Sequence, residues 1–542
     1  MAWEPEIMLT PRITVTDSSD AAGARPEFTR AATMLAAAAL VLSGLAVYHN
    51  SLAGPFVYDD VPAIVENPTI RRLWPLTLPL SPPQGSGVTV NGRPVLNLSF
   101  AVNYALSGDA VWSYHALNLV IHVLAGLTLF GVIHRTLARM DHAPGRRVEV
   151  RASYLLSLAV AVLWTVHPLQ TESVTYVVQR AESLMGLFYL LTLYCFIRAA
   201  DCNLPNGKPT ARRTVVCQVC CVVCCLLGMA TKEVMVTAPL MVFLYDRTFV
   251  SGGFAAAWRR HWRLYFGLAA TWLLLGCLVA GTGGNLGGSA GFGVGVSWWT
   301  YTLTQFHAIE RYLVLAVWPH PLVFDYGSFW VTRAAEVARP ALVVAALATG
   351  TAVFLWRRPA LGFAGAWFFG ILAPTSLVPG TTQMLVEHRT YLPLAAIVTA
   401  AGYGIHALTR RRSLMLLAGL GAALGWLTVQ RNQDYRSALA IWTDTTAKRP
   451  DNELAQNNLG NALLAADRVQ DAIWRYEQAR RLDPADAKAC SNLGNALIRA
   501  GRLDEALVQC TEAVRLDPDV AEAYFNRGYV LLQTGQLTGA IR

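Results

Sequence analysis

The chain has 542 residues, of which 54% are apolar and only 15% are charged. Soluble domains carry roughly 25% charged residues, so this composition argues against an ordinary soluble protein and favours one embedded in a membrane. The net charge of +9 comes from short arginine clusters between apolar runs, which indicates membrane topology rather than nucleic-acid binding. Charges are rare between about residues 33 and 430 and return afterwards, so we expect a domain boundary near Gln430.

Apolar runs that could cross a membrane as helices follow one another between residues 32 and 430. A bilayer core of about 30 Å requires roughly 20 apolar residues per crossing, and a few of these runs are short. We predict an all-α membrane domain of about eleven spans, preceded by a cytoplasmic tail over residues 1–31, with the first span an uncleaved anchor. The predicted spans are 32–48, 110–133, 152–166, 184–197, 214–229, 234–245, 264–281, 341–356, 361–378, 392–408 and 414–429.

Clusters of Arg and Lys predict the orientation of these spans, because positive residues concentrate in cytoplasmic loops. Their positions predict a cytoplasmic N-terminus. The basic clusters fall on the cytoplasmic side along the whole chain only if residues 298–318 do not cross the membrane. That segment carries His307, Glu310 and Arg311, which are costly at the middle of a bilayer, and begins with two tryptophans typical of an interface. We expect it to lie on the outer face. An odd number of spans then places the C-terminal tail outside as well.

The sequence after Gln430 repeats itself with a period of about 34 residues, the length of a tetratricopeptide (TPR) unit. The motif Asn-Leu-Gly-Asn-Ala-Leu begins at Asn458 and again at Asn492, and the units close on Leu-Asp-Pro. Small residues let two helices pack closely, and the proline ends the second helix. We predict a TPR solenoid over residues 431–542 with an incomplete last unit, and expect it to bind a protein in its concave groove.

The first outer loop carries two adjacent carboxylates, Asp59 and Asp60, only a few residues after the first span. Burial and mutual repulsion raise the pKa of one member of such a pair, which prepares a general base. The alternative is a turn or helix cap, since the sequence Asp-Asp-Val-Pro suits the start of a helix. The pair by itself therefore leaves both interpretations open.

Three further outer connections carry charged residues close to the membrane, where such groups normally pair or line a cavity. The residues of interest in them are His167, Glu172, Arg180, Glu182, Lys232, Glu233, Glu387, Arg389 and Tyr391. The alternatives are an interfacial helix with snorkelling ends for residues 167–184 and a solvated hairpin tip at Lys232. An Arg at a lipid boundary suits a phosphate, because its fork of donors matches phosphate oxygens. Transfer of a sugar from a lipid phosphate requires such carboxylates, cations and aromatic groups on one side of a membrane.

These residues resemble the motifs of the TMTC family of transmembrane, TPR-containing O-mannosyltransferases and its bacterial relatives, within the GT-C superfamily of membrane glycosyltransferases. Residues 58–60 match an aromatic-Asp-Asp motif, residues 167–172 match His-Pro-x-x-Thr-Glu, and residues 180–182 match Arg-Ala-Glu. Lys232-Glu233 and the block 387–393 follow in family order. In that block His388 separates Glu387 from Arg389, where the family pattern has the acid and the Arg adjacent. The resemblance covers nearly the whole chain after the first span and implies a GT-C-like domain over residues 32–430.

The resemblance implies transfer of a sugar, mannose by analogy, from a polyprenyl-phosphate donor to Ser or Thr hydroxyls of a protein held by the TPR groove. It implies an acidic base, for which we expect Asp59 or Asp60, with Asp60 slightly favoured. Arg389 is the expected ligand of the donor phosphate, followed by Lys232 and Arg180. The residues expected to orient the site or bind the acceptor are His167, Glu172, Glu182, Glu233, Glu387 and Tyr391.

No obligatory cofactor is expected and a divalent metal remains an option, because the outer face has no clear His/Cys ligand set. The five cysteines of residues 217–225 lack the distant second pair of a zinc site and suit packing. We expect a bacterial inner-membrane protein or, in a eukaryote, an ER protein, with the TPR tail on the periplasmic or lumenal side.

Two other functions remain open. The first is a non-catalytic scaffold that assembles envelope complexes through its TPRs. The second is a transporter or flippase, which is disfavoured because the two halves of the membrane domain show no internal repeat.

Overall fold

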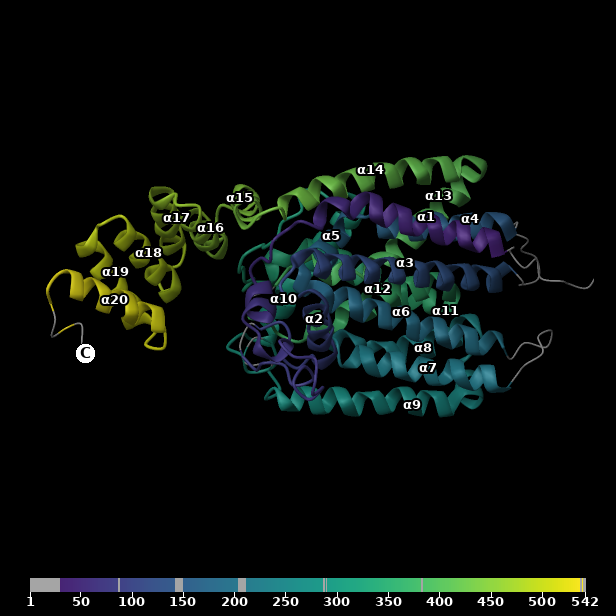
Figure 1. Ribbon diagram of the computed structural model, residues 1–542. Helices are drawn as coiled ribbons and strands as arrows, with labels where there is room; N and C mark the ends of the chain where they lie inside the picture. The colour runs from purple at the N-terminus through teal and green to yellow at the C-terminus, as the bar shows by residue number, and fades with distance from the viewer. Residues whose placement is uncertain are drawn as a thin grey trace, which may run out of the picture.

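The computed structural model describes residues 30–85, 88–141, 150–202, 211–285, 288, 290–381, 384–536 and 539. They form a bundle of long helices with a smaller array of short helices at one end (Figure 1). The all-α prediction is confirmed. The predicted N-terminal tail lies almost entirely outside the described residues, which begin with Arg30 in α1.

The helices of the membrane body and of the C-terminal array have the following bounds. The body contains α1 (Arg30–Tyr48), α2 (Pro94–Ser107), α3 (Val111–Asp141), α4 (Val150–Thr165), α5 (Thr171–Thr175), α6 (Arg180–Asp201), α7 (Ala211–Met229), α8 (Ala238–Phe249), α9 (Phe254–Gly281), α10 (Trp298–Val317), α11 (Ala338–Arg357), α12 (Pro359–Leu377), α13 (Pro393–Thr409) and α14 (Ser413–Asp434). The array contains α15 (Ala438–Lys448), α16 (Glu453–Ala465), α17 (Val469–Leu482), α18 (Ala487–Arg499), α19 (Leu503–Leu516) and α20 (Ala521–Gln533).

By length and composition, eight of the described helical segments could cross a membrane, or nine if the bent pair Arg151–Thr165 and Pro168–Thr175 is one span. The prediction of about eleven is higher for two reasons. Helix α8 has only 12 residues. Helices α13 and α14 count as one segment of 42 residues, although a basic turn at Arg410–Arg412 separates them. Helix α10 is not among the eight described segments, in agreement with the expectation that it does not cross.

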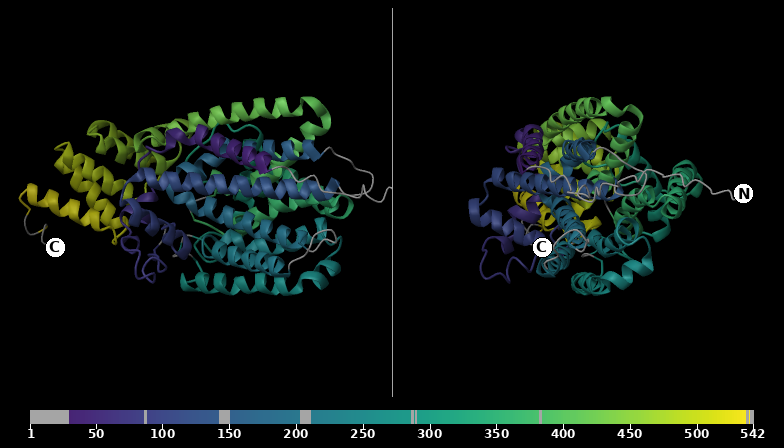
Figure 2. Two further views of the ribbon diagram at one scale, coloured as in Figure 1. Left: turned by 45° about the vertical axis from the view of Figure 1, so that its right-hand side comes forward. Right: turned by 90° about the vertical axis from the view of Figure 1, so that its right-hand side faces the viewer.

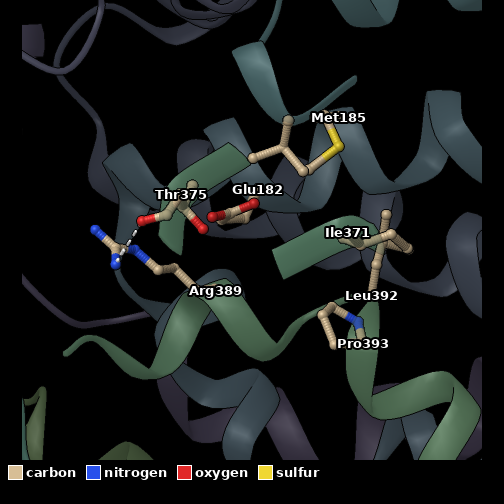
Figure 3. Close-up of a pocket in the computed structure, with 8 residues that line it drawn as sticks. Glu182, Met185, Ile371, Thr375, Arg389, Leu392 and Pro393 are labelled. Carbon is tan, nitrogen blue, oxygen red and sulfur yellow. Dashed lines mark hydrogen bonds between the residues drawn. The ribbon is translucent and has the colours of Figure 1, made fainter. Parts of the chain in front are cut away.

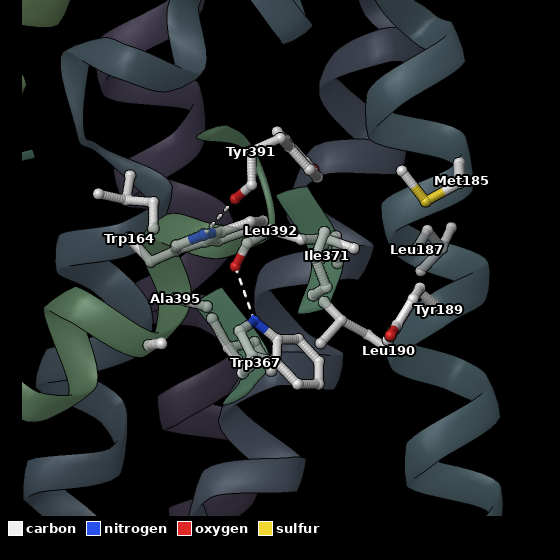
Figure 4. Packing of buried hydrophobic residues seen from close by; sticks show 14 of the residues in the cluster. Trp164, Met185, Leu187, Tyr189, Leu190, Trp367, Ile371, Tyr391, Leu392 and Ala395 are labelled. Carbon is white, nitrogen blue, oxygen red and sulfur yellow. Dashed lines mark hydrogen bonds between the residues drawn. The ribbon is translucent and has the colours of Figure 1, made fainter. Parts of the chain in front are cut away.

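Two buried tryptophans fix the segment that leads into α13 (Figure 4). The indole Nε1 of Trp164 donates to the carbonyl of Tyr391 at 3.0 Å, and that of Trp367 donates to the carbonyl of Leu392 at 2.9 Å. A buried indole N–H needs such a partner, so each tryptophan contributes both apolar packing and a directional contact. Gly186 on α6 completes the arrangement, because a Cβ there would lie 2.5 Å from the ring of Tyr391.

The C-terminal helices pack as antiparallel neighbours, as the repeat predicts. Gly460 on α16 allows a close approach, since a Cβ there would lie 2.5 Å from the ring of Tyr476 on α17. Gly494 faces Cys510 in the same way in the next pair. Helix α15 packs against α16 and joins the array to α14.

The array lies at the end of the bundle that carries the loop after α1, and α1 begins toward the opposite end (Figure 2). The loop and the array share one hydrophobic cluster. Within it the ring of Trp442 on α15 lies 5.5 Å from that of Tyr58 and 5.2 Å from that of Phe324. The first helix of the array is therefore packed directly on the loop that contains Asp59 and Asp60.

Candidate functional site

Asp60 is fully buried, and both of its carboxylate oxygens accept backbone hydrogen bonds. Oδ2 accepts from the N–H of Val57 at 2.9 Å, and Oδ1 accepts from the N–H of Val178 at 2.7 Å. Burial raises its pKa to about 8. Asp60 thus ties the loop after α1 to the segment before α6. With both oxygens engaged, Asp60 is suited to hold these two segments in place. The sequence slightly favoured it as the base instead.

Asp59 differs from its neighbour because the residue is partly exposed. Its backbone N–H donates to the hydroxyl of Tyr176 at 2.9 Å, which fixes its place in the loop. Burial, with the nearby charges of Asp325 and Glu172, raises its pKa to about 7, while hydrogen bonding with Tyr176 opposes the increase. A carboxylate with such a pKa is well suited to accept a proton near neutral pH. The geometry therefore favours Asp59 over Asp60 as a base.

Glu172 and His388 form a buried pair that joins two motifs. The Nδ1 of His388 lies 2.8 Å from Oε1 of Glu172, and the N–H of His388 donates to Oε2 at 2.9 Å. Burial, reinforced by the charge of Lys232, holds the pKa of His388 well below its usual range. The imidazole is therefore neutral, and its proton lies on Nδ1 when Glu172 is ionised, because a carboxylate only accepts. His388, which the sequence showed only as a departure from the family pattern, is a partner of Glu172.

Glu387 is also buried and holds the loop before α11. Its Oε1 accepts from the N–H of Val323 at 2.6 Å and from the hydroxyl of Tyr326 at 2.9 Å. Burial raises its pKa. In the same loop Oδ1 of Asp325 accepts from the side-chain amide of Asn452 at 2.7 Å. Asn452 caps α16, so this loop connects Glu387 to the C-terminal array.

Two of the predicted phosphate ligands have buried partners of their own. Arg180 donates through Nε to Oδ1 of Asn118 at 2.6 Å and through Nη2 to the carbonyl of Tyr114 at 3.1 Å. Lys232 donates to Oε1 of Glu182 at 2.7 Å. Both cations therefore contribute to holding the bundle together.

A second ion pair lies beside the Lys232–Glu182 pair. Glu233 accepts from Nε of Arg93 at 3.1 Å and from its Nη2 at 3.0 Å. This bidentate partner was not identified from the sequence, because Arg93 lies in the first outer loop, far from Glu233 in the chain. Adjacent residues 232 and 233 thus bind opposite charges from different elements.

Arg389 lines a narrow cavity together with Glu182 and Thr375 (Figure 3). Its Nη1 lies 3.4 Å from the hydroxyl of Tyr301 and 3.4 Å from the carbonyls of Thr375 and Met384. The cavity volume is about 10 Å³, enough for roughly one water molecule. Arg389 therefore has partners inside the bundle, and the adjacent space does not accommodate a sugar phosphate.

His167 and Tyr391 have positioning contacts. Nδ1 of His167 accepts from the N–H of Leu169 at 3.2 Å, and Nε2 donates to the carbonyl of Ala316 at 3.2 Å. The hydroxyl of Tyr391 lies 2.9 Å from Nδ1 of His122. Both residues set the geometry of the connections rather than facing an open site.

Arg431, at the end of α14, was missed by the sequence analysis. It is buried and its Nη1 donates to Asp434 at 2.9 Å and to Asp444 at 3.0 Å. Its positive charge acts on both Glu172 and Glu387. A cation here offsets the negative charge of the carboxylate cluster. Only its position after the last span, just before the repeats, could have identified it.

The side chains present do not form an evident metal centre. Among the described residues, no group of three or more His, Cys, Asp or Glu side chains could hold a metal ion. The cysteines of α7 lie within the helix bundle or on its surface, and the described cysteines are free thiols.

Comparisons with known proteins find similarities in both parts of the chain. A family model described as "TPR repeat" matches residues 494–535, and one described as "Tetratricopeptide repeat" matches residues 463–509. The chain is 24% identical over 471 residues to the protein O-mannosyl-transferase F38B6.6 of Caenorhabditis elegans, covering 82% of this chain and 63% of that protein.

Two human proteins show higher identity over shorter stretches. Protein O-mannosyl-transferase TMTC1 of Homo sapiens is 30% identical over 220 residues, or 39% of this chain and 24% of that protein. Protein O-mannosyl-transferase TMTC2 of Homo sapiens is 32% identical over 163 residues, or 29% of this chain and 18% of that protein. The chain spans less than two thirds of the length of each of these relatives.

Proposed function

Because this chain is a homologue of the TMTC-family protein O-mannosyltransferases with C-terminal TPR repeats, we propose that it transfers a sugar from a lipid-phosphate donor to protein hydroxyls. The donor is a polyprenyl-phosphate sugar, with mannose the sugar by analogy, and the acceptors are Ser and Thr side chains. The observation that carries the proposal is Asp59, a partly exposed carboxylate with a pKa raised to about 7, fixed by Tyr176 beside the TPR array.

In this reaction the Asp59 carboxylate takes the proton of the acceptor hydroxyl while the hydroxyl oxygen attacks the anomeric carbon of the sugar. The bond from that carbon to the phosphate oxygen breaks, and the lipid phosphate leaves with the bonding electron pair. One displacement occurs at the carbon, so the anomeric configuration inverts. The buried Asp60, Glu172 and Glu387 hold the loops that surround Asp59 in place.

Two features support a location of the site on the outer or lumenal face. Arginines that favour the cytoplasm, among them Arg139, Arg198 and Arg212, lie near the ends of α3, α6 and α7 away from the TPR array (Figure 1). The loop with Asp59 and the array lie together at the other end. An acceptor protein held by the repeats would therefore reach the base without crossing the membrane.

The test compares Asp59→Asn with Asp109→Asn in membranes supplied with polyprenyl-phosphate mannose. Removal of a general base lowers the rate by about 10²–10⁴-fold, and we expect that loss for Asp59→Asn. Asp109 is a matched control, because its carboxylate lies at the same end of the bundle and is exposed, paired with Arg71 at 2.8 Å. Full transfer by a folded Asp59→Asn variant would exclude Asp59 as the base. Capture of protein partners without sugar transfer by the parent would favour a scaffold instead.

A further inference from the structure

A cavity of about 580 Å³ opens between the membrane body and the first helix of the TPR array. Its walls come from α10, the loop before α11, the start of α11 and the C-terminal end of α15. Helix α10 lies at the end of the bundle that faces the array (Figure 1). A volume of this size falls in the range of sites for small organic ligands. It is much larger than the space beside Arg389.

Positive charge dominates the lining of this cavity. The lining includes Arg311, Arg339, Lys448 and Arg449, against one carboxylate, Glu310. Elements far apart in the sequence thus bring four basic side chains to one cavity. Guanidinium and ammonium groups arranged in this way match the oxygens of a phosphate.

Existing contacts hold two of these cations in position. Nη2 of Arg311 donates to the carbonyl of Pro321 at 2.9 Å. Nζ of Lys448 donates to the carbonyl of Leu322 at 2.8 Å and to Asp444 at 2.7 Å. Because one N–H of Arg311 is engaged in this way, its guanidinium is oriented before a ligand arrives, which reduces the entropy lost on binding.

The other two cations have looser partners. Arg339 pairs with Glu310 at 2.9 Å, but its side chain is 82% exposed. Nε of Arg449 lies 3.3 Å from Asp451 at the surface. Exposed pairs of this kind contribute little free energy, so an incoming anion can compete for both arginines.

An apolar surface adjoins the charged lining on α10. Val314 lines the cavity and is 46% exposed, and Val317 and Trp318 beyond it are 77% and 69% exposed. Trp298 and Trp299 begin the same helix and are exposed as well. Exposed tryptophan on an amphipathic helix is typical of a membrane–water interface. The cavity therefore lies where a lipid would present its head group to water and its chain to the bilayer.

The cavity shares a wall with the carboxylate cluster. Val323 and Tyr326 line it, and both donate hydrogen bonds to Oε1 of Glu387. Asp325, one of the two residues between them in this loop, acts electrostatically on Asp59. A ligand bound by the cations would thus lie next to the proposed site rather than on a remote surface.

We propose that this cavity binds the phosphate of the lipid-linked sugar donor, with Arg311 and Arg449 as the principal ligands and the prenyl chain along α10. The proposal rests on the proposed function for the identity of the donor. It differs from the expectation based on the sequence, which placed the phosphate on Arg389, Lys232 and Arg180. Those cations have partners inside the bundle, whereas Arg311 and Arg449 line a cavity of sufficient size.

The experiment measures binding of farnesyl phosphate to the purified full chain in detergent by isothermal titration calorimetry. We expect the double variant Arg311→Gln/Arg449→Gln to raise the Kd about tenfold, as expected for loss of charge-assisted hydrogen bonds. Arg436→Gln is the matched control, because Arg436 lies after α14 at the same end and outside the cavity lining. We expect it to leave the Kd unchanged.

Two further ligands separate the sources of affinity. Farnesol, which lacks the phosphate, and inorganic phosphate, which lacks the chain, should each bind at least tenfold more weakly than farnesyl phosphate. Equal binding of farnesol would overturn the phosphate site, and equal binding of inorganic phosphate would overturn the lipid as its source. An unchanged Kd in the double variant would overturn the assignment. If the double variant does not fold, the single variant Arg449→Gln, whose residue pairs with Asp451 at the surface, replaces it. An unchanged Kd for farnesyl phosphate in that variant would overturn the assignment.

The same measurements distinguish this site from the proposed base. Asp59→Asn should bind farnesyl phosphate like the parent and fail to transfer sugar. Transfer at the parental rate by Asp59→Asn, combined with weaker binding by the double variant, would refute the base and leave the phosphate site in place.

Discussion

The imidazole of His388 lies 2.8 Å from a carboxylate oxygen of Glu172, although 216 positions separate the two residues in the chain. Both side chains are buried, so the contact ties the segment before α13 to the segment between α4 and α6. An unpaired buried carboxylate costs more than an unpaired exposed one, because water cannot replace the lost donor. Loss of either partner should therefore loosen both of these segments near Asp59.

We expect His388→Ala to lower the free energy of unfolding by about 1–3 kcal/mol, because Glu172 loses its side-chain donor in a buried site. His388→Asn should recover part of the loss, since the amide of Asn can donate from a position close to that of Nδ1. Thermal unfolding of the purified proteins in detergent measures both. Equal stability of His388→Ala and the parent would show that the contact contributes nothing.

The rate of sugar transfer should depend on the ionisation of Asp59. Its pKa is raised to about 7, and a base acts only when deprotonated, so the rate should rise as pH increases through about 7 and then level off. Asp325→Asn removes one of the negative charges that raise this pKa, and its amide oxygen can still accept hydrogen bonds. The midpoint of the pH profile should therefore move to lower pH. A midpoint that stays fixed, or moves upward, would contradict the role of Asp325.

The protonation of Asp60 should appear as a pH dependence of stability. Its folded-state pKa is raised from 3.8 to about 8, so the stability linked to its protonated form is present below about pH 4 and is lost as pH rises toward 8. Asp60→Asn keeps one acceptor oxygen and loses the other, so it should be less stable than the parent at pH 5. The difference should shrink by pH 8, where the parent has lost this contribution. Unfolding temperatures measured at both pH values test this, and a difference independent of pH would refute it.

The hydrogen bond from Asn452 to Asp325 should couple the TPR array to the activity of Asp59. Asn452→Ala removes both the cap of α16 and the donor to Asp325, whereas Asp486→Ala removes only the equivalent cap of α18. Each should cost about 0.5–2 kcal/mol in the stability of the array. Only Asn452→Ala should also lower the rate of transfer. A similar loss of rate in both variants would assign the effect to the caps alone.

Much of the architecture follows from local sequence patterns. The small residues and prolines of the repeat predicted the helix pairs of the array, and the charges of α10 keep it out of the segments that are apolar enough to cross. The predicted number of spans exceeds the eight or nine described segments of sufficient length, in part because hydropathy does not distinguish a short buried helix such as α8 from a crossing. Pairs such as Arg93–Glu233 and Glu172–His388 could not be predicted, because their members come from different connections and only the packing of the bundle brings them together.

The two aspartates show the same limit at the scale of a single side chain. The sequence placed both in the first outer loop and suggested that one of them is a base. The choice between them depends on two backbone N–H groups, those of Val57 and Val178, which occupy the oxygens of Asp60. One of these donors lies 118 positions away, beyond the reach of any local pattern.

The packing of Trp442 against Tyr58 has a consequence for which hydroxyls could be modified. Because the first repeat helix and the loop with Asp59 share one core, the repeats are held at a fixed spacing from the base rather than on a flexible tether. A polypeptide bound by the array would then bring to Asp59 only those hydroxyls that lie a set number of residues from the bound segment. The choice among serines and threonines would then depend on how many residues separate each hydroxyl from the bound segment. The residues that flank the hydroxyl would matter less.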